Sequence, residues 1–378
     1  MLSLSALNLP GQLDLLAVLI GFVATFLATW VLCKLTGFNR WGHDRDLGVQ
    51  KFHVRPTSRL GGLAIAIGLC LSGLLNLGEA SSVSKDFHNF SFLMLIAAAP
   101  VWFAGLTEDM THKVGPTLRL VMATLSAAWL FGSLGVGVNR TDVWLIDLIL
   151  QMPGGPLCVT LLVVAGFTHS INIVDGFHGL ASGLMVIALC ALSYMAWQAG
   201  DTLMLQMCLT SMSVLLGFFV FNWPRGDIFL GDAGAYLIGF WVVELGILIA
   251  MRNQSISPMA PVVAGLLPLI ETLFSMYRRK IVKDYPVNHP DALHMHTLIY
   301  KRLLLNPSIN NSQEEKNSLN GRVALYFWLP AALFSAASCS LVGSTTWQLV
   351  LMLIYLAMYV WLYSRLVRFK SPHFMKFR

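Results

Sequence analysis

The sequence CVTLLVVAGFTHSINIVDGFHGLASGLMVIALCALSYMAW, residues 158–197, contains two apolar runs around the short polar segment NIVDGFHG. Each run has the apolar character and approximate length of a membrane-spanning helix. The polar segment places Asn172, Asp175 and His178 in the gap between them. Because ionisable groups at membrane depth are costly and usually functional, the stretch predicts two spans joined by a turn that contains functional residues.

The rest of the chain repeats this pattern of apolar runs. Of its 378 residues, 56% are hydrophobic and only 12% are charged, whereas about 25% are charged in an ordinary soluble domain. The mean hydropathy is +0.68. The runs do not alternate apolar and polar residues as the strands of a membrane barrel do. The sequence therefore predicts an all-α, polytopic integral membrane protein, with residues 1–378 forming a single membrane domain.

The apolar runs define about eleven transmembrane helices. These predicted spans are 15–37, 60–78, 91–106, 119–137, 156–171, 179–198, 202–221, 233–251, 258–277, 323–342 and 346–365. One set of alternating gaps, with Arg119 at a span edge, carries 21 Lys and Arg residues, and the other set carries three. Because positively charged loops remain in the cytoplasm, we expect a cytoplasmic C-terminus and an N-terminus on the opposite side. Residues 278–322 are the long predicted cytoplasmic loop, and 143–151 is a short interfacial or re-entrant helix.

Five polar clusters fall on the predicted cytoplasmic side. They are KFHVRPTSRLGG (51–62), GLTEDMTHK (105–113), NIVDGFHG (172–179), NWPRGDIFLGDAG (222–234) and HPDALHMHTLIYKR (289–302). Their carboxylates suit Mg²⁺, which takes one or two carboxylates and leaves other positions to water and phosphate. Glycines let the backbone approach a ligand, and the basic residues supply donors to phosphate. Together the clusters predict a magnesium–diphosphate site at the cytoplasmic face.

The same motifs, in this order, resemble those of the polyprenyl-phosphate N-acetylhexosamine-1-phosphate transferases. This family, glycosyltransferase family 4, belongs to the superfamily that contains phospho-MurNAc-pentapeptide translocase. The resemblance extends from about Lys51 to Lys301. It rests on the segment His53–Gly62, the pair Glu108-Asp109, Asn172-Ile-Val-Asp175-Gly176, Phe229-Leu-Gly231-Asp232-Ala-Gly234 and His294-Met-His296. Eleven spans with a cytoplasmic tail are similar to the branch that uses UDP-N-acetylhexosamines.

The resemblance implies a reaction at the bacterial inner membrane. A UDP-N-acetylhexosamine would donate sugar-1-phosphate to undecaprenyl phosphate and release UMP, with Mg²⁺, or alternatively Mn²⁺, as cofactor. The lipid-linked sugar diphosphate would initiate O-antigen, capsule or another cell-envelope glycan. Dimers occur in the superfamily, so a homodimer is also an expectation.

The resemblance also assigns roles to individual residues. Asp232 would bind the metal, and Asp109 would be the catalytic carboxylate near the lipid phosphate, with Glu108 beside it. The implied substrate-binding residues are Lys51, Thr57, Arg59, Asn172, Asp175, His178, His294 and His296. Three positions depart from the family pattern: Glu108 and His178 replace Asp, and Ala292 stands where Arg is common. The last two concern recognition of the base and the sugar.

Several alternatives remain open at this stage. Asp232 and Asp175 are also good helix caps, and the basic loop residues also serve membrane orientation. The lipid phosphate could attack the donor directly, or Asp109 could act as a nucleophile in a double displacement. A multi-spanning transporter of a phosphorylated solute is the alternative function, although the chain lacks the repeated halves of many transporters.

Overall fold

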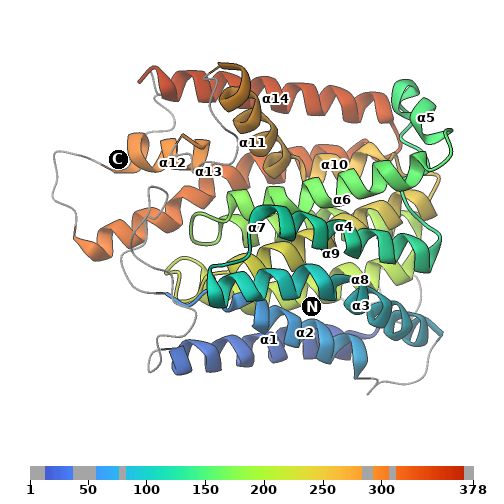
Figure 1. Cartoon of the computed structure of the whole chain (residues 1–378), viewed down its shortest axis with the longest axis horizontal. Coiled ribbons are helices and arrows are strands. Elements are labelled where there is room, and N and C mark those ends of the chain that lie inside the picture. Colours follow the sequence, from blue (N-terminus) through green and yellow to red (C-terminus); the bar gives the residue numbers. More distant parts are fainter. Residues whose placement is uncertain (1–12, 37–56, 76–81, 283–292, 306–311, 370–378) are drawn as a thin grey trace, which may run out of the picture.

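The computed structural model describes residues 13–36, 57–75, 82–282, 293–305 and 312–369, and within these ranges all regular elements are helices (Figure 1). Within the described residues, nine helices are long and apolar enough to cross a membrane. They are α1 (Leu15–Thr36), α3 (Ser82–Thr111), α4 (Pro116–Leu134), α6 (Gly155–Val174), α7 (Leu180–Ala199), α8 (Thr202–Asn222), α9 (Gly231–Arg252), α13 (Gln313–Ser340) and α14 (Thr345–Val367). The shorter elements are α2 (Gly61–Leu74), α5 (Trp144–Leu150), α10 (Met259–Ala264), α11 (Leu266–Tyr277), α12 (Met295–Ile299) and two π-helical turns, η2 (Arg278–Val282) and η3 (Tyr300–Leu304).

Each of the eleven predicted spans has a helical counterpart among the described residues, but one is shorter than predicted and one is divided. The second span is represented by the 14-residue helix α2. The prediction of one continuous helix over 258–277 is wrong, because the structure divides it into α10 and α11 at Gly265. Pro268 lies in the first turn of α11 and cannot donate a backbone hydrogen bond to Ala264, which interrupts the helix at this point.

Two helices extend well beyond their predicted spans. α3 begins at Ser82 and continues to Thr111. α13 begins at Gln313, so the prediction that 313–322 belongs to a polar loop is wrong. Ser312 and Glu315 form a capping box at this start, in which each side chain binds the backbone N–H of the other. The polar sequence is therefore a helix that extends beyond the apolar part of the span.

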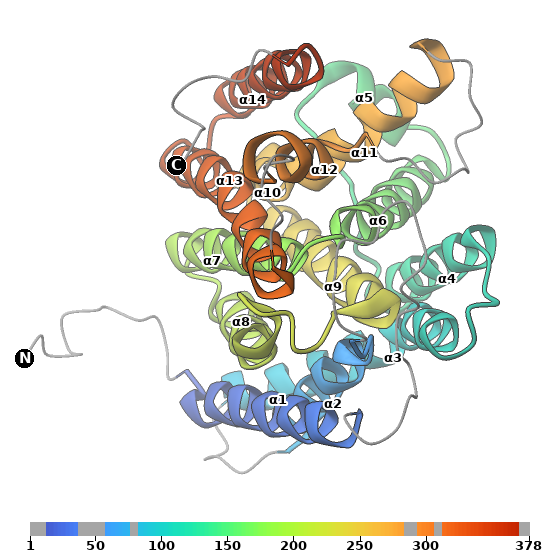
Figure 2. The same cartoon turned by 90° about the vertical axis from the view of Figure 1, so that its left-hand side faces the viewer.

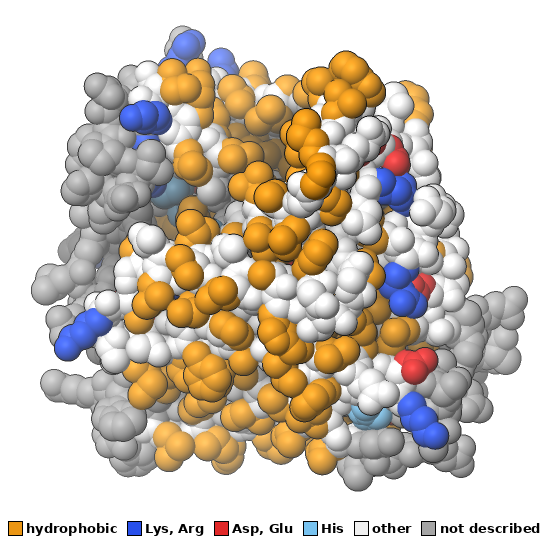
Figure 3. Space-filling view, turned by 45° about the vertical axis from the view of Figure 1, so that its right-hand side comes forward, with side chains coloured by type: hydrophobic (Ala, Val, Ile, Leu, Met, Phe, Trp, Pro, Cys, Tyr) orange, Lys and Arg blue, Asp and Glu red, His pale blue; other side chains and the backbone are white. Residues whose placement is uncertain are grey.

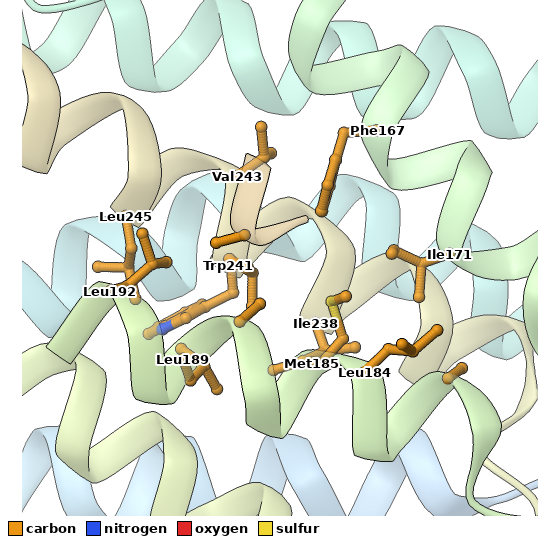
Figure 4. Close-up of a cluster of buried hydrophobic side chains, with 14 of the residues drawn as sticks. Phe167, Ile171, Leu184, Met185, Leu189, Leu192, Ile238, Trp241, Val243 and Leu245 are labelled. Atoms are coloured by element: carbon orange, nitrogen blue, oxygen red, sulfur yellow. The ribbon is translucent and has the colours of Figure 1, made fainter. Parts of the chain in front are cut away.

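α9 lies at the centre of the bundle, as the end-on view in Figure 2 shows. All residues from Gly231 to Ala250 are buried. The helix packs against α3, α6, α2 and α7. Phe167 of α6, Met185 of α7 and Trp241 of α9 meet in the apolar core drawn in Figure 4. The most buried of these membrane-spanning helices therefore carries the predicted metal ligand, Asp232, in its first turn.

The outer surface is apolar over a broad band. In Figure 3 hydrophobic side chains cover the middle of the molecule, and charged side chains gather towards its two ends. Large apolar side chains are exposed on the outer helices, including Leu162, which is 74% exposed, and Leu353, which is 66% exposed. A surface of this kind requires lipid rather than water. The protein is therefore a multi-pass membrane protein.

Candidate functional site: an acid–arginine cluster at the start of α9

The buried carboxylate of Asp109 lies against the first turn of α9. Asp109 is near the end of α3 and is 0% exposed. Its two oxygens accept hydrogen bonds from the backbone N–H groups of Asp232 and Ala233, at 2.9 and 2.8 Å. A helix N-terminus carries partial positive charge and unsatisfied N–H groups, so that it stabilises an anion. Asp109 thus joins the end of α3 to the start of α9.

Asp232 is surrounded by positive and amide groups from three other elements. The Arg59 guanidinium donates to its Oδ1 at 2.7 Å and lies 3.3 Å from Asp109. Asn172, at the end of α6, donates to the same oxygen at 3.0 Å. Arg119 of α4 forms an ion pair with Oδ2. Four predicted site residues, Arg59, Asp109, Asn172 and Asp232, therefore converge at one point.

Glycines allow this convergence because backbone segments approach within the reach of a Cβ atom. A Cβ on Gly62 would lie 2.2 Å from the backbone nitrogen of Gly234, and one on Gly105 would lie 2.6 Å from the Cα of Ala233. Gly231 has φ +72° and a Cβ there would meet the Arg59 carbonyl oxygen at 2.0 Å. The glycines of the predicted motifs thus let α2 and α3 pack directly on the start of α9.

Asp175 lies beside this cluster, at the turn that follows α6. It is half-buried. Burial raises the pKa of the Asp175 carboxyl to about 7, and the nearby Arg59 guanidinium partly offsets this effect. Asp109, Asp175 and Asp232 together face the guanidinium groups of Arg59 and Arg119. The cluster therefore holds three carboxyl groups beside two guanidinium groups, and burial favours the neutral form of Asp175.

This donor set fits a hard divalent cation bound with few protein ligands. Among the residues that the structure describes, no three His, Cys, Asp or Glu side chains are arranged to hold a metal ion. Mg²⁺ needs only one or two carboxylates when water and substrate phosphates occupy its other positions. Asp232 offers oxygen ligands, and its guanidinium neighbours are groups that also bind phosphate.

His178 is packed into the loop between α6 and α7. It is 2% exposed, and its backbone N–H donates to the Asn320 side chain at 2.9 Å. Its ring lies 5.6 Å from that of Phe229. Gly321 accepts a hydrogen bond from the Trp223 indole at 2.9 Å. The start of α13 therefore supports the loops around the site.

The predicted histidine motif reaches the same loop from the other side. The rings of His294 and His296 are nearly parallel, with centroids 5.1 Å apart and an angle of 4°. Both are buried, and His296 packs against Phe177 at 5.5 Å. A Cβ on Gly176 would lie 3.5 Å from His296 Nε2. The motif thus contacts the turn that contains Asp175.

The remaining predicted site residues lie at more distant positions. Glu108 accepts a hydrogen bond from the backbone N–H of Val114 at 2.7 Å, so it closes the loop after α3. Thr57 is buried and lines a cleft of about 780 Å³ together with Lys34, Arg225 and other residues. Lys51 lies outside the described residues.

Three residues that contact the site were not predicted to belong to it. The sequence placed Arg119 only at a span edge, Glu271 within the predicted span 258–277, and Asn320 within the predicted loop 278–322. Each is polar at or near a span end, which is the only signal that the sequence offers. Their partners are Asp232, His294 and His178, and these pairs are far apart in the sequence.

The fold and the cluster define a class: a multi-pass membrane protein with a polar site at one end of its helices. The sequence model described as "Glycosyl transferase family 4" matches residues 91–250. This match is to the same family that the five ordered motifs resemble.

Several relatives of known description are similar to the chain. The "Probable undecaprenyl-phosphate N-acetylglucosaminyl 1-phosphate transferase" of Bacillus subtilis (strain 168) is 28% identical over 248 residues, covering 65% of this chain and 66% of the relative. The "Decaprenyl-phosphate N-acetylglucosaminephosphotransferase" of Mycolicibacterium smegmatis is 28% identical over 356 residues, covering 86% and 82%. The "Phospho-N-acetylmuramoyl-pentapeptide-transferase" of Lactobacillus johnsonii is 25% identical over 295 residues, covering 72% and 89%.

Proposed function

We propose that this protein transfers N-acetylhexosamine-1-phosphate from a UDP-sugar to undecaprenyl phosphate and releases UMP. The observation that carries the proposal is the convergence of Arg59, Asp109, Asn172 and Asp232 at the start of α9. The names of the relatives in B. subtilis and M. smegmatis support a polyprenyl-phosphate acceptor and an N-acetylglucosamine-1-phosphate donor group. The product would enter the synthesis of O-antigen, capsule or another cell-envelope glycan.

The charged groups of the cluster divide into acidic and basic roles. Asp232 would hold Mg²⁺, which would supply positive charge to the donor diphosphate. Arg59 and Arg119 would bind phosphate oxygens, because a guanidinium pairs with phosphate as well as with carboxylate. Asp175 and Asn172 would contact the donor next to them. His178 would lie at the base-binding end of the donor site, and Thr57 and Lys51 would border it.

The environment of Asp109 favours direct attack by the lipid phosphate. Both Asp109 oxygens already accept backbone hydrogen bonds from α9, and Arg59 lies 3.3 Å away. A carboxylate held in this way is a weakened nucleophile, because attack would require it to give up these bonds. The acceptor phosphate has a second pKa near 6 and is largely dianionic at neutral pH. Asp109 would therefore orient the acceptor and the first turn of α9.

The proposal includes an orientation in the membrane. The site lies at the end of the bundle where the predicted cytoplasmic segments gather (the left-hand side of Figure 1). Soluble UDP-sugars are cytoplasmic substrates in the proposed reaction, so this end would face the cytoplasm of a bacterial inner membrane. The N-terminus would then be periplasmic and the C-terminus cytoplasmic. A homodimer is compatible with this arrangement.

The decisive test is UMP release by purified protein in detergent. Undecaprenyl phosphate and Mg²⁺ would be supplied with UDP-GlcNAc, UDP-GalNAc or UDP-QuiNAc in separate reactions. We expect UMP release that requires lipid, metal and Asp232, and the active donor identifies the sugar. Protein that is folded and releases no UMP with a broad panel of nucleotide sugars would contradict the proposal and return attention to a transporter, which releases none.

A further inference from the structure

Three polar side chains on one face of α11 and of the turn that follows it contact the same histidine, His294. Glu271, Ser275 and Arg279 are spaced four residues apart, so they lie on one side of a helix. Glu271 Oε1 is 3.0 Å and Ser275 Oγ 3.2 Å from His294 Nδ1. The Arg279 guanidinium is 3.3 Å from His294 Nε2. The histidine motif is therefore held by α11, a helix that the sequence motifs of the family resemblance did not include.

Glu271 is the central residue of this contact. It is 1% exposed, and its Oε1 also accepts the backbone N–H of Met295 at 2.9 Å. Its Oε2 accepts the hydroxyl of Tyr359, on α14, at 2.7 Å. One carboxylate thus connects α11, α12 and α14. Burying a carboxylate is costly unless several donors satisfy it, and apolar side chains could join these helices without that cost.

The contacts define the tautomer of the His294 ring. A carboxylate only accepts hydrogen bonds, so Nδ1 carries the proton that it shares with Glu271. A guanidinium only donates, so Nε2 accepts from Arg279. A carboxylate that fixes a histidine tautomer in this way commonly orients a functional imidazole.

The orientation extends to His296. Glu271 binds the backbone of Met295, which lies between the two histidines, and Glu271 Oε1 is 3.9 Å from His296 Nδ1. The two imidazole rings stack. The opposite nitrogen of His296, Nε2, is the one next to Gly176. The ring is therefore fixed with Nδ1 towards Glu271 and Nε2 towards the Asp175 turn.

We propose that Glu271 is a positioning residue for the transfer reaction, which acts by holding His294 and His296 so that His296 Nε2 faces the donor-binding turn at 175–179. This inference rests on the proposed function. His296 would contact the donor, and Glu271 would act only through the histidines. Tyr359 supports this arrangement, because its hydroxyl donates a hydrogen bond to the second carboxylate oxygen of Glu271.

A double-mutant cycle on donor kinetics tests this proposal. Glu271→Leu should lower kcat/KM for the UDP-sugar about 10- to 100-fold, the range found when the partner that orients a functional histidine is removed. The KM for undecaprenyl phosphate should not change. Glu271→Gln keeps an oxygen acceptor and should restore most of the activity. In a His296→Ala background, Glu271→Leu should cause little further loss, because its effect passes through that ring.

The matched control is Glu244→Leu, on α9, which removes the other glutamate that is buried in the described part of the chain. It should leave donor kcat/KM within about twofold, since Glu244 is far along α9 from Asp232 at about 1.5 Å per residue. If Glu271→Leu does not fold, Tyr359→Phe offers a smaller change in the same contact, with a several-fold loss expected. Its loss should also disappear in the His296→Ala background.

The outcomes separate this inference from the proposed function. Wild-type protein that releases no UMP with any donor overturns both. Active wild type with an active, folded Glu271→Leu variant overturns the inference alone. Losses of Glu271→Leu and His296→Ala that multiply in the double variant would also overturn it, because they would mean that Glu271 supports packing independently of the histidine.

Discussion

α9 carries a carboxylate–arginine contact at each end, and the two differ in every respect that bears on function. In its first turn, the single carboxylate of Asp232 contacts both Arg59 and Arg119. In its last turn, Arg252 pairs with one carboxylate, Asp201, at 2.8 Å. Arg252 is 42% exposed, whereas Arg119 is only 12% exposed. At both ends the charge on α9 itself, Asp232 in the first turn and Arg252 in the last, has the sign that the helix dipole favours there.

The charges at the end of α9 stabilise the fold, whereas those at its start are more numerous than helix capping requires. Asp201 caps α8 by accepting the N–H of Met204, and it also contacts Asn253. The negative charge of Asp201 is balanced by the positive charge of Arg252, and its other partners are neutral. At the other end, acidic and basic groups are crowded into a buried volume and surrounded by glycine. Such crowding of charged groups is typical of functional sites, where a charged ligand can replace some of the ion pairs.

Asp232→Asn should have the largest effect on turnover. Asparagine keeps the size of the side chain but removes the charge that we propose binds the cation. We expect kcat for UMP release to fall at least about 100- to 1000-fold, the loss that follows removal of one key electrostatic group. Kinetics with saturating lipid and donor provide the measurement.

Asp201→Asn is the control at the other end of α9. It removes one carboxylate charge from the same helix bundle and should leave kcat unchanged. Equal losses of turnover in the two variants would mean that both pairs serve only stability, and that the proposed distinction between the ends is wrong. A thermal midpoint for each variant, measured in the same detergent, separates misfolding from lost chemistry.

Gly231→Ala should have the largest effect on stability. Gly231 has φ +72° and its Cβ position overlaps the Arg59 carbonyl oxygen. The left-handed conformation costs roughly 1–2 kcal/mol for an L-residue, and forced overpacking adds about 1–3 kcal/mol. We expect a clear fall in thermal midpoint together with loss of activity.

The matched control is Gly166→Ala, within α6. A Cβ there meets nothing within 4 Å, and alanine favours the helix by about 0.8–1 kcal/mol. This variant should be as stable as the wild type or slightly more stable. If both variants behave alike, the close approach of α2 and α9 is not what requires glycine at the site.

The sequence predicted the helical class and much of the cluster because both depend on short continuous segments of the chain. Apolar runs of spanning length need no knowledge of their partners, and the family motifs contain Asp109, Asn172 and Asp232. The break at Gly265 could not be obtained from apolarity, because 258–277 is apolar throughout its length. Pro268 was the available signal, and it was outweighed by the run of apolar residues around it.

The rest of the site depends on contacts between distant segments. Arg119 is separated from Asp232 by 113 positions, and Asn320 from His178 by 142. No periodicity links such pairs. Glu271 lies near the end of the predicted span 258–277, but its role requires the position of His294, at the start of α12. Polar residues at span ends identify candidates, and only the tertiary structure assigns their partners.

Arg119→Lys should have an intermediate effect on turnover. Lysine keeps the charge but loses the planar group that contacts Asp232 and lies over the Tyr236 ring, 5.6 Å from its centroid. One charge-assisted hydrogen bond is worth roughly 1.5–3 kcal/mol, so we expect kcat to fall about tenfold. Arg140→Lys, at the opposite end, is the control and should not change kcat, although Arg140 binds three backbone carbonyls there. Unchanged turnover in Arg119→Lys would indicate that Arg119 supplies charge alone.

The smallest expected effect concerns acid stability at the opposite end. Burial alone would raise the pKa of Asp201, but hydrogen bonds from Arg252, Met204 and Asn253 hold it below its usual value. A carboxyl with a depressed folded pKa stabilises the protein above its unfolded pKa, near 3.9, and loses this contribution as the pH falls through the folded pKa. Wild-type stability should therefore decline below about pH 4 by more than that of Asp201→Asn.

Asparagine makes this test specific for the ion pair. It is as good an N-cap as aspartate, so the hydrogen bond to Met204 survives, while the charge opposite Arg252 is lost. Because the Arg252 side chain is 42% exposed, the pair should contribute no more than about 1 kcal/mol at neutral pH. The thermal midpoint should fall slightly at pH 7 in the variant, and the difference from wild type should disappear as the pH is lowered. A difference that stays constant down to acidic pH would mean that the charge of Asp201 is not its source, and the pair with Arg252 would then contribute nothing to stability.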